Sequence, residues 1–206
     1  MIIAVDGPTA SGKGTIAKAL AAHFGLPHLD TGLLYRAVGL QCALNGGDPD
    51  NPQDALAACN FPDRLIADPE LRSEATGGLA SRVSIHPEVR AALFDLQRAF
   101  ATQPGGAVLD GRDIGTVIAP EAEVKLFVTA SVAARAQRRF AEMREGGRKV
   151  SLAQIAADLE ARDLRDRTRA EAPLIAAADA LVLDTSTAGR DEAIAEAIRA
   201  AEMLIA

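Results

Sequence analysis

The stretch that decides the fold reads Gly7-Pro8-Thr9-Ala10-Ser11-Gly12-Lys13-Gly14-Thr15. It directly follows the apolar run of residues 2–5 and opens a segment, residues 12–24, in which apolar side chains recur at helical spacing. A glycine-rich loop between a strand and a helix turns backbone N–H groups toward a bound phosphate, and its lysine reaches the β- and γ-phosphates. We therefore expect residues 7–15 to bind ATP and Lys13 to be catalytic. The alternative is a flexible turn with a surface lysine.

The residue after Lys13 departs from the common form of this loop. Many such loops hold Mg²⁺ with a serine or threonine at that position, whereas here it is Gly14, and the hydroxyl comes one place later, at Thr15. Asp30 and Asp110 each end a short apolar run, and a parallel sheet would bring both to its ligand-binding edge. We therefore expect Mg²⁺ to be held, in part through water, by Asp110, Asp30 and Thr15. Alternatively, each aspartate only caps the turn that follows it.

Strand-like and helix-like segments alternate along the chain, which is the pattern of a parallel sheet with helices on both faces. The expected strands are residues 2–5, 28–29, 107–109, 124–128 and 180–183. The expected helices are residues 12–24, 32–44, 86–100, 131–145, 151–165 and 191–204. Residues 48–78 are rich in proline, glycine and aspartate with weak periodicity, which indicates an insertion rather than core. The sequence thus predicts a single α/β domain over residues 1–206.

The composition argues against several classes of protein. Hydrophobic residues make up 49% of the chain, yet no apolar run approaches the roughly 20 residues of a membrane span. The first residues read as a strand, which argues against a secretory or transit peptide. Cys42 and Cys59 have no metal-ligand spacing, and the three histidines form no cluster. We expect a cytoplasmic protein with reduced thiols, no zinc site and no membrane association.

Charge is distributed unevenly along the chain. The net charge of −6 argues against general affinity for nucleic acid, yet residues 135–169 hold ten basic and six acidic side chains. Eighteen of the 22 basic residues are arginine, whose planar fork suits bidentate contacts with phosphate. Codon bias and solvated helix faces would produce the same composition.

Three turn-rich segments place arginines after expected strands or at a helix end, namely residues 30–36, 110–116 and 162–169. In the last segment Arg162, Asp166 and Arg169 stand at i, i+4 and i+7, which puts them on one face of a helix. A single run of this kind is typical of salt bridges on a solvated helix. Three such segments behind a phosphate loop favour recognition of a second phosphate, which indicates a kinase.

The chain as a whole closely resembles the bacterial cytidylate kinases. The resemblance covers almost the whole length and is carried by GPTASGKGT, HLDTGLLYRAV, ASRVSIHPEVRAAL, QRAFA, LDGRDIGTV, VKLFVTAS, ARDLRDRTRAEAPL and DALVLDTS. Adenylate and guanylate kinases share the loop but lack the Gly-Arg-Asp and Arg-Asp-x-x-Asp-Arg segments. The resemblance implies a three-layer P-loop kinase fold with a five-stranded parallel sheet, a monophosphate-binding insertion (residues 48–85) and a lid. We expect the lid over about residues 141–169, with Gly146 and Gly147 as its hinge.

The resemblance also implies an activity, the transfer of the γ-phosphoryl group of ATP to CMP or dCMP. The side chains that would hold the acceptor phosphate are Thr31, Arg36, Arg112 and Arg169. The cytosine edge presents an amino donor and two acceptors, and the residues implied to recognise it are Ser81, Arg90 and Asp113. Asp166 would bind the ribose hydroxyls. Arg162 and Arg167 would neutralise charge on the transferring phosphoryl group.

Two departures from the family limit this transfer of roles. Thr31 stands where the family commonly has serine, although both residues keep the hydroxyl. Residues 48–78 look shorter than the family's insertion, which usually adds a small sheet. The sequence therefore leaves open the architecture of the insertion and the choice between CMP and dCMP.

Several other functions compete with this interpretation. A kinase for another small acceptor, such as UMP or shikimate, would share the phosphate loop. A nucleotide-binding switch would bind ATP without turnover, and it would not explain the second set of arginines. Nucleic-acid binding is disfavoured because the chain outside residues 135–169 is strongly acidic. A GTPase is excluded because no Asn-Lys-x-Asp or Thr-Lys-x-Asp sequence surrounds any of the four lysines. We expect a monomer, since no long apolar surface stripe is evident.

Overall fold

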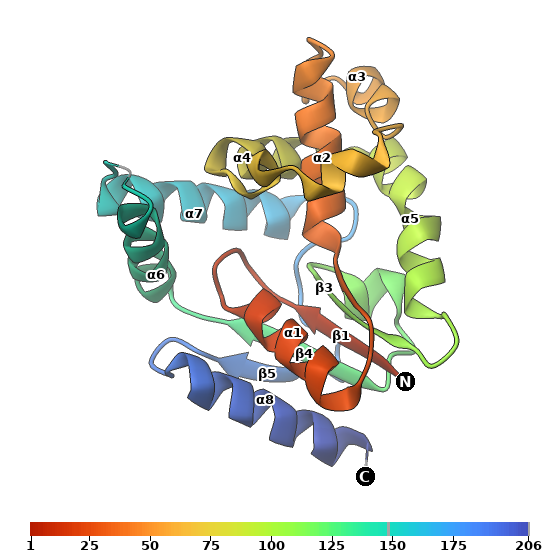
Figure 1. Ribbon diagram of the computed structural model, residues 1–206, viewed down its shortest axis with the longest axis vertical. Helices are drawn as coiled ribbons and strands as arrows, with labels where there is room; N and C mark the ends of the chain where they lie inside the picture. The colour runs from red at the N-terminus through yellow and green to blue at the C-terminus, as the bar shows by residue number, and fades with distance from the viewer. Residues whose placement is uncertain (148, 206) are drawn as a thin grey trace.

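A computed structural model describes residues 1–147 and 149–205 (Figure 1). Its centre is a parallel sheet of five strands in the order β2-β3-β1-β4-β5. The strands are β1 (Ile2–Asp6), β2 (His28–Asp30), β3 (Ala107–Gly111), β4 (Val124–Thr129) and β5 (Leu181–Asp184). β3 enters between β1 and β2, so that Asp110 pairs with Val5 on one side and Asp30 on the other. The predicted α/β fold with a five-stranded parallel sheet is confirmed.

Helices cover both faces of the sheet, and β1 and β3 are therefore buried on both sides, as is usual for a parallel sheet. α1 (Lys13–Phe24) and α8 (Arg190–Ile205) pack on one face, which is the face nearer the viewer in Figure 1. α5 (Pro87–Ala101) and a one-turn π-helix, η3 (Ile114–Ile118), cover the other face. The sequence predicted only a turn where the π-helix lies.

Residues 48–85 form a helical layer that packs on α2 (Thr31–Leu44) around a buried cluster shared with α2 and α5. The layer consists of α3 (Pro52–Ala57), η1 (Asp63–Ala67), η2 (Pro69–Arg72) and α4 (Glu74–Val83). Residues 48–85 are all described, and none of them forms a strand. The small sheet that the family's insertion usually adds is therefore replaced by helices. The sequence did not predict α4, because the adjacent glycines Gly77 and Gly78 obscure its helical pattern.

α6 (Val132–Glu145) and α7 (Leu152–Thr168) pack on each other beside the insertion. α6 stops at Gly146, and the next residue, Gly147, takes the left-handed conformation with a φ of 74°. The chain thus breaks where the two glycines predicted a break. Arg148, within the predicted lid, and Ala206, at the end of the predicted domain, lie outside the described residues.

The C-terminal end of α7 differs from the prediction. The helix continues three residues beyond position 165 and ends at Thr168, after which Arg169 is extended with φ −62° and ψ 142°. Arg169 has therefore left the helix, and the prediction that it shares a helical face with Arg162 and Asp166 is wrong. None of the helices within residues 1–147 and 149–205 combines the length and apolar character needed to cross a membrane.

Candidate active site

The phosphate loop leaves the C-terminal end of β1 and enters α1 at Lys13. Gly12 and Ala10 have left-handed backbones, with φ values of 91° and 62°, and such reversals of handedness form anion-binding concavities. Gly7 serves packing, since a Cβ there would lie 2.0 Å from the carbonyl oxygen of Val128 on β4. Residues 9–15 line the cavity described next, whereas Gly7 and Pro8, also predicted to bind ATP, do not.

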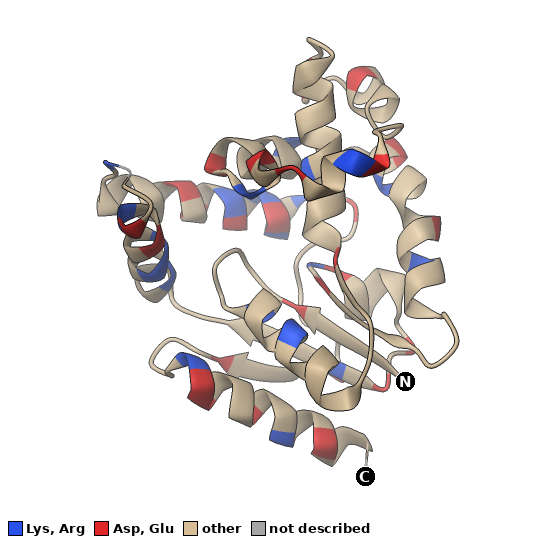
Figure 2. Cartoon of the chain, viewed as in Figure 1, with Lys and Arg blue, Asp and Glu red and all other residues tan. Residues whose placement is uncertain are grey.

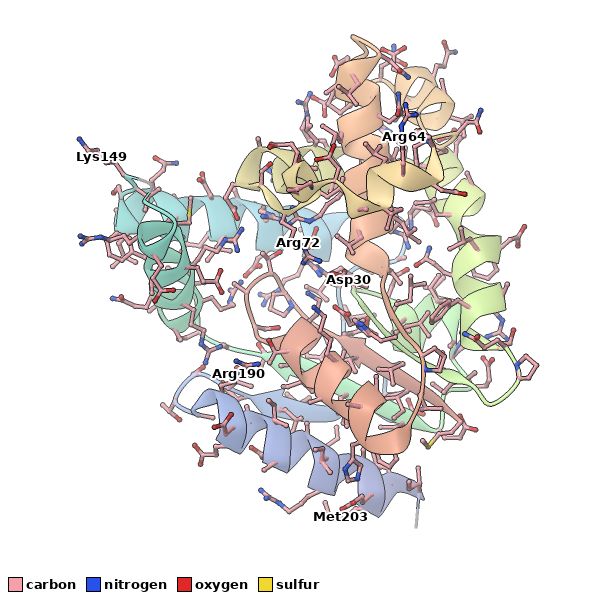
Figure 3. All side chains as sticks on the ribbon, in the orientation of Figure 1. Asp30, Arg64, Arg72, Lys149, Arg190 and Met203 are labelled. Carbon is pink, nitrogen blue, oxygen red and sulfur yellow. The ribbon has the colours of Figure 1, made fainter. Side chains whose placement is uncertain are left out.

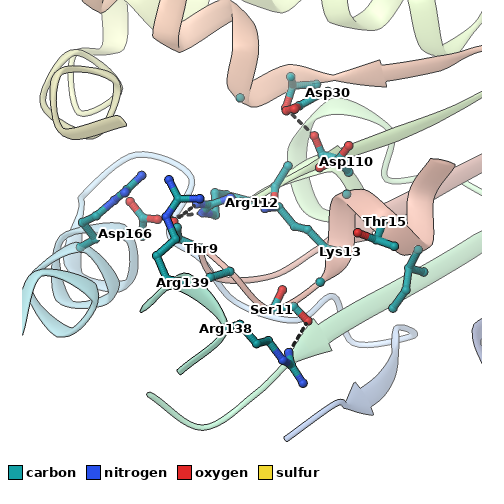
Figure 4. A pocket seen from close by; sticks show the side chains of 18 of the residues that line it. Thr9, Ser11, Lys13, Thr15, Asp30, Asp110, Arg112, Arg138, Arg139 and Asp166 are labelled. Carbon is teal, nitrogen blue, oxygen red and sulfur yellow. Dashed lines mark hydrogen bonds and ion pairs between the residues drawn. The ribbon is translucent and has the colours of Figure 1, made fainter. Parts of the chain in front are cut away.

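A cavity of about 960 Å³ opens where the phosphate loop, the insertion and helices α6 and α7 meet (Figure 4). Lys and Arg residues recur along α6 and α7 (Figure 2). Beyond the loop, the predicted site residues that line the cavity are Asp30, Thr31, Arg36, Ser81, Arg90, Asp110, Arg112, Asp113, Arg162, Asp166 and Arg169. Arg36, Arg112 and Arg169 come from distant parts of the sequence and border the same space as Lys13.

Arg167 is the predicted catalytic residue that the structure does not bring to the cavity. Its side chain is exposed and is absent from the cavity wall. The reason is helical geometry, because Arg167 lies about 140° around α7 from Arg162. Arg167 thus does not face the cavity in this structure, and its catalytic role stays a prediction.

Lys13 extends into the cavity toward Arg112 and Asp110 (Figure 4). Burial, and after it the Arg112 guanidinium, lowers the pKa of its ammonium group to about 8. The carboxylates of Asp110 and Asp30 act in the opposite direction but do not compensate. A cation that is poorly solvated in this way is stabilised by an incoming anion, so the environment of Lys13 favours a bound phosphate.

Arg112 connects the phosphate loop with α7. Its Nη2 donates a hydrogen bond to Thr9 Oγ1 (2.6 Å), and its Nε donates to Asp166 Oδ2 (2.8 Å). Burial would raise the pKa of the Asp166 carboxyl, but the charge and hydrogen bond of Arg112 outweigh burial and hold that pKa below its ordinary value. Arg112 is thus fixed between the expected donor and acceptor sides of the cavity.

A second cluster of charged groups surrounds Asp113, which follows β3. Arg90 of α5 pairs with Asp113 Oδ2, and Arg169 Nη2 lies 3.7 Å from Asp113 Oδ1. Nearby on α4, Ser81 Oγ accepts a hydrogen bond from Arg165 Nε at 3.1 Å, a contact that the sequence did not predict. A carboxylate, a hydroxyl and guanidinium groups therefore lie together in this part of the molecule. Such a set can both donate to and accept from a polar base edge.

Arg162 and Arg36 add two more cations to the cavity wall. Burial, and after it the neighbouring guanidinium groups of Arg112 and Arg36, lowers the pKa of Arg162 to about 10. Arg36 Nη1 donates hydrogen bonds to the backbone carbonyls of Leu71 (2.6 Å) and Ser73 (2.9 Å), which fixes it against the insertion. These arginines repel one another, so the cavity favours a polyanion.

Carboxylates occupy the wall next to the phosphate loop. Asp110 is buried, and its Oδ1 lies 2.7 Å from Nε2 of His28, a partner that the sequence did not predict. Its Oδ2 faces the start of α1, where a Cβ on Gly14 would lie 3.6 Å away. Asp30 and Thr15 line the same cavity. No cluster of three or more His, Cys, Asp or Glu side chains able to hold a metal occurs among the described residues.

Two arginines of α6 contact the phosphate loop and were not predicted individually. Arg135, which is fully buried, pairs with Asp163 at 3.1 and 2.5 Å and donates to the carbonyl of Thr9 at 3.1 Å. Arg138 Nη1 donates to the carbonyl of Ser11 at 3.5 Å and to Thr185 Oγ1 at 3.1 Å, and Arg138 lines the cavity. The excess of basic residues over positions 135–169 was the only signal of these contacts in the sequence.

Asp6, at the end of β1, is another buried residue that the sequence reasoning missed. Its two carboxylate oxygens accept hydrogen bonds from the backbone N–H groups of Ile114 (2.9 Å) and Gly115 (2.8 Å). Burial raises the pKa of Asp6 to about 7, although both hydrogen bonds act to lower it. Asp6 thereby anchors the turn that carries Arg112 and Asp113.

The sheet, the loop with Lys13 and the second group of arginines in one cavity define a P-loop kinase whose acceptor is itself an anion. Comparison with known proteins agrees with this class. The model of the cytidylate kinase family matches residues 3–203, and the chain belongs to that family.

Curated relatives match over nearly their full length. The cytidylate kinase of Azorhizobium caulinodans is 55% identical over 203 residues, 98% of each chain. That of Cereibacter sphaeroides is 55% identical over 201 residues, 98% of this chain and 95% of the relative. A solved structure of an uncharacterized protein from Eubacterium ventriosum superposes with a TM-score of 0.54 at 16% identity, over 98% of both chains, and shares the fold.

Proposed function

We propose that the cavity transfers the γ-phosphoryl group of ATP to the 5′-phosphate of CMP or dCMP, giving ADP and CDP or dCDP. The observation that carries this proposal is that Arg36, Arg112 and Arg169 line the same cavity as Lys13. The donor and the acceptor phosphate then each have a set of cations. The volume of about 960 Å³ is at the upper end for ligand pockets, as two nucleotides require.

The acceptor would bind between the sheet edge and the insertion. Its phosphate would contact the hydroxyl of Thr31 and the guanidinium groups of Arg36, Arg112 and Arg169. The cytosine would meet the cluster of Asp113, Arg90 and Ser81, since a carboxylate accepts from the amino group and an arginine donates to the ring acceptors. Asp166, which lines the same wall, would accept from the ribose hydroxyls.

Catalysis would consist of positioning and charge neutralisation. The acceptor phosphate is already a nucleophile at neutral pH, so no general base is needed for in-line attack. Lys13 would bind the β- and γ-phosphates of ATP, and Arg162 would neutralise the transferring group. α6 and α7 would close over the reactants and exclude water, which would otherwise hydrolyse ATP.

The proposal includes Mg²⁺. Asp30, Asp110 and Thr15 line one cavity and offer only oxygen ligands, and Mg²⁺ is commonly bound by one or two carboxylates together with water and substrate phosphates. These residues therefore fit the ion and would hold it, in part through water. When bound, Mg²⁺ would neutralise charge on the donor phosphates.

We also propose that the enzyme acts as a cytoplasmic monomer that does not bind nucleic acid. The net charge of −6 supports the last point, and the unpaired thiols of Cys42 and Cys59 fit a reducing compartment.

The test of the reaction is the release of ADP from MgATP with CMP, dCMP, UMP, AMP or shikimate supplied in turn. CMP and dCMP should give turnover far above the rate without an acceptor. A higher rate with UMP or shikimate would contradict the proposed acceptor. ATP binding without ADP release under any condition would instead indicate a nucleotide-binding switch.

A further inference from the structure

A second cavity, of about 400 Å³, lies on the other side of two arginines that border the substrate cavity. Arg139 of α6 and Arg162 of α7 line both cavities, whereas Glu74 of α4 lines only the second one. The two arginine side chains therefore form a partition. Substrates would approach this partition from one side, and Glu74 approaches it from the other.

Glu74 pairs with both arginines of the partition. One of its carboxylate oxygens pairs with Arg139 Nη2, and the other lies 3.6 Å from Arg162 Nη1. The Nε atoms of Arg139 and Arg162 are buried and have no hydrogen-bond partner within residues 1–147 and 149–205. A single carboxylate thus pairs with two guanidinium groups, and the Nε–H group of each guanidinium makes no hydrogen bond within the described residues.

Gly77 lies on the same face of α4, three residues after Glu74. A Cβ at Gly77 would lie 2.9 Å from Arg36 Nη2 and 3.2 Å from Arg162 Nη1. Glycine weakens a helix relative to alanine, so its presence inside α4 needs a reason. The close approach of the two guanidinium groups supplies that reason. At the neighbouring Gly78, a Cβ would meet no described atom within 4 Å.

We propose that Glu74 is a positioning residue for phosphoryl transfer. Gly77, which has no side chain, leaves room for the guanidinium groups of Arg36 and Arg162 beside it. The like charges of Arg112, Arg36 and Arg139 act together on Arg162 and would push it out of place, with Asp166 on the same helix as an opposing carboxylate. The carboxylate of Glu74 attracts Arg162 from the side of the second cavity and so opposes this repulsion. Because Glu74 belongs to the insertion and Arg162 to α7, the transferring phosphoryl group is neutralised only when these two parts are together. This inference rests on the proposed reaction.

A simpler role for Glu74 would be to stabilise α4 alone. An acidic residue in the first turn of a helix interacts favourably with the helix dipole. That role predicts a change in thermal stability without a specific loss of turnover. The two roles can therefore be separated by measuring kcat, KM and Tm on the same variants.

The test uses two pairs of matched variants of the full chain. Glu74→Gln removes the charge and keeps the shape, and Glu70→Gln, at an exposed position of η2, is its control. Gly77→Ala displaces the guanidinium groups, and Gly78→Ala is its control. For each protein, kcat, the KM values for ATP and CMP, and Tm are measured.

Glu74→Gln and Gly77→Ala should each lower kcat by about tenfold or more, because small displacements of catalytic groups are costly. Their KM for ATP should stay within about twofold of wild type, since the phosphate loop is untouched. Gly77→Ala should keep the Tm of wild type or raise it, while both controls keep normal kcat.

Normal kcat in both Glu74→Gln and Gly77→Ala would overturn the positioning role. So would a loss of kcat that follows a fall in Tm and a rise in both KM values, which indicates a structural effect. Wild-type activity with CMP is measured first, and its absence would overturn the proposed reaction and this inference together. Normal wild-type turnover with unaffected variants would overturn the inference alone.

Discussion

Lys13 combines a depressed pKa with a place between carboxylates and Arg112, as expected for a residue that binds phosphate. Replacing it by alanine should lower kcat/KM roughly 100-fold or more, because it removes a preorganised charge from the transition state. The fold should persist, since removing a poorly solvated cation relieves a cost in the native state. Steady-state kinetics and thermal unfolding check both parts. Near-normal turnover would contradict the role of Lys13.

Asp113 forms ion pairs with Arg90 and Arg169, at the place proposed for the cytosine. Asp113→Ala should raise the KM for CMP much more than that for ATP. It should also reduce the preference for CMP over UMP, because the acceptor of the cytosine amino group is lost. The ratio of kcat/KM values for the two monophosphates is the measurement. If the variant uses CMP as well as wild type does, the base-binding role of Asp113 is wrong.

Because of Asp6, the stability of the folded protein should depend on pH. Its pKa is about 7 in the native state, above the ordinary value of 3.8, because it is buried. The native protein then holds this proton more tightly than the unfolded chain does, so the contribution of Asp6 to stability is present below about pH 4 and is lost as the pH rises to about 7. Asp6→Asn abolishes this titration. The Tm of wild type minus that of the variant should fall between pH 5 and pH 8; a constant difference would refute the raised pKa.

Among the structural elements, the link between α6 and α7 depends on Gly147, which has a φ of 74°. Gly147→Ala should strain this link by about 1 kcal/mol and disturb closure, so kcat should fall. Gly146→Ala is the matched control, because Gly146 has a φ of −75° and a Cβ there would make ordinary contacts. If both variants have the same kcat, Gly147 is not a hinge.

The helices and strands could be predicted from the sequence, whereas most of the contacts between them could not. Each predicted strand and helix lies within three residues of its observed bounds, because hydrophobic periodicity is local. α4 was not predicted because two adjacent glycines interrupt its helical pattern, and one of them, Gly77, serves a contact with Arg36 and Arg162 rather than the helix. The partners of Asp6 are 108 and 109 residues away in the chain and that of His28 is 82 residues away, so a local pattern could not predict them either. The phosphate loop, Asp30 and Asp110 were predicted from local patterns, whereas the residues on the acceptor side of the cavity were predicted through family resemblance, which carries such long-range information.

At the scale of the whole molecule, the cavity exists only where three parts meet. The sheet edge contributes Asp110, the insertion holds Arg36 of α2 through a backbone carbonyl, and α7 contributes Asp166. Figure 3 labels three residues that line this cavity and come from separate elements, namely Asp30, Arg72 and Arg190. Recognition of two nucleotides is therefore a property of the assembled fold, and no single segment contains it.

The order of the strands also dictates when the cavity can form during synthesis. The central strand β1 leaves the ribosome first, yet its neighbours β3 and β4 begin at Ala107 and Val124, in the second half of the polypeptide. β1 and the loop that follows it therefore have no hydrogen-bonded partner strand while residues 7–106 are made, and such distant pairings form slowly. Meanwhile α2, α4 and α5 can already collapse around their shared apolar cluster. A nascent chain arrested before β3 emerges should thus possess a compact helical part and no capacity to retain ATP.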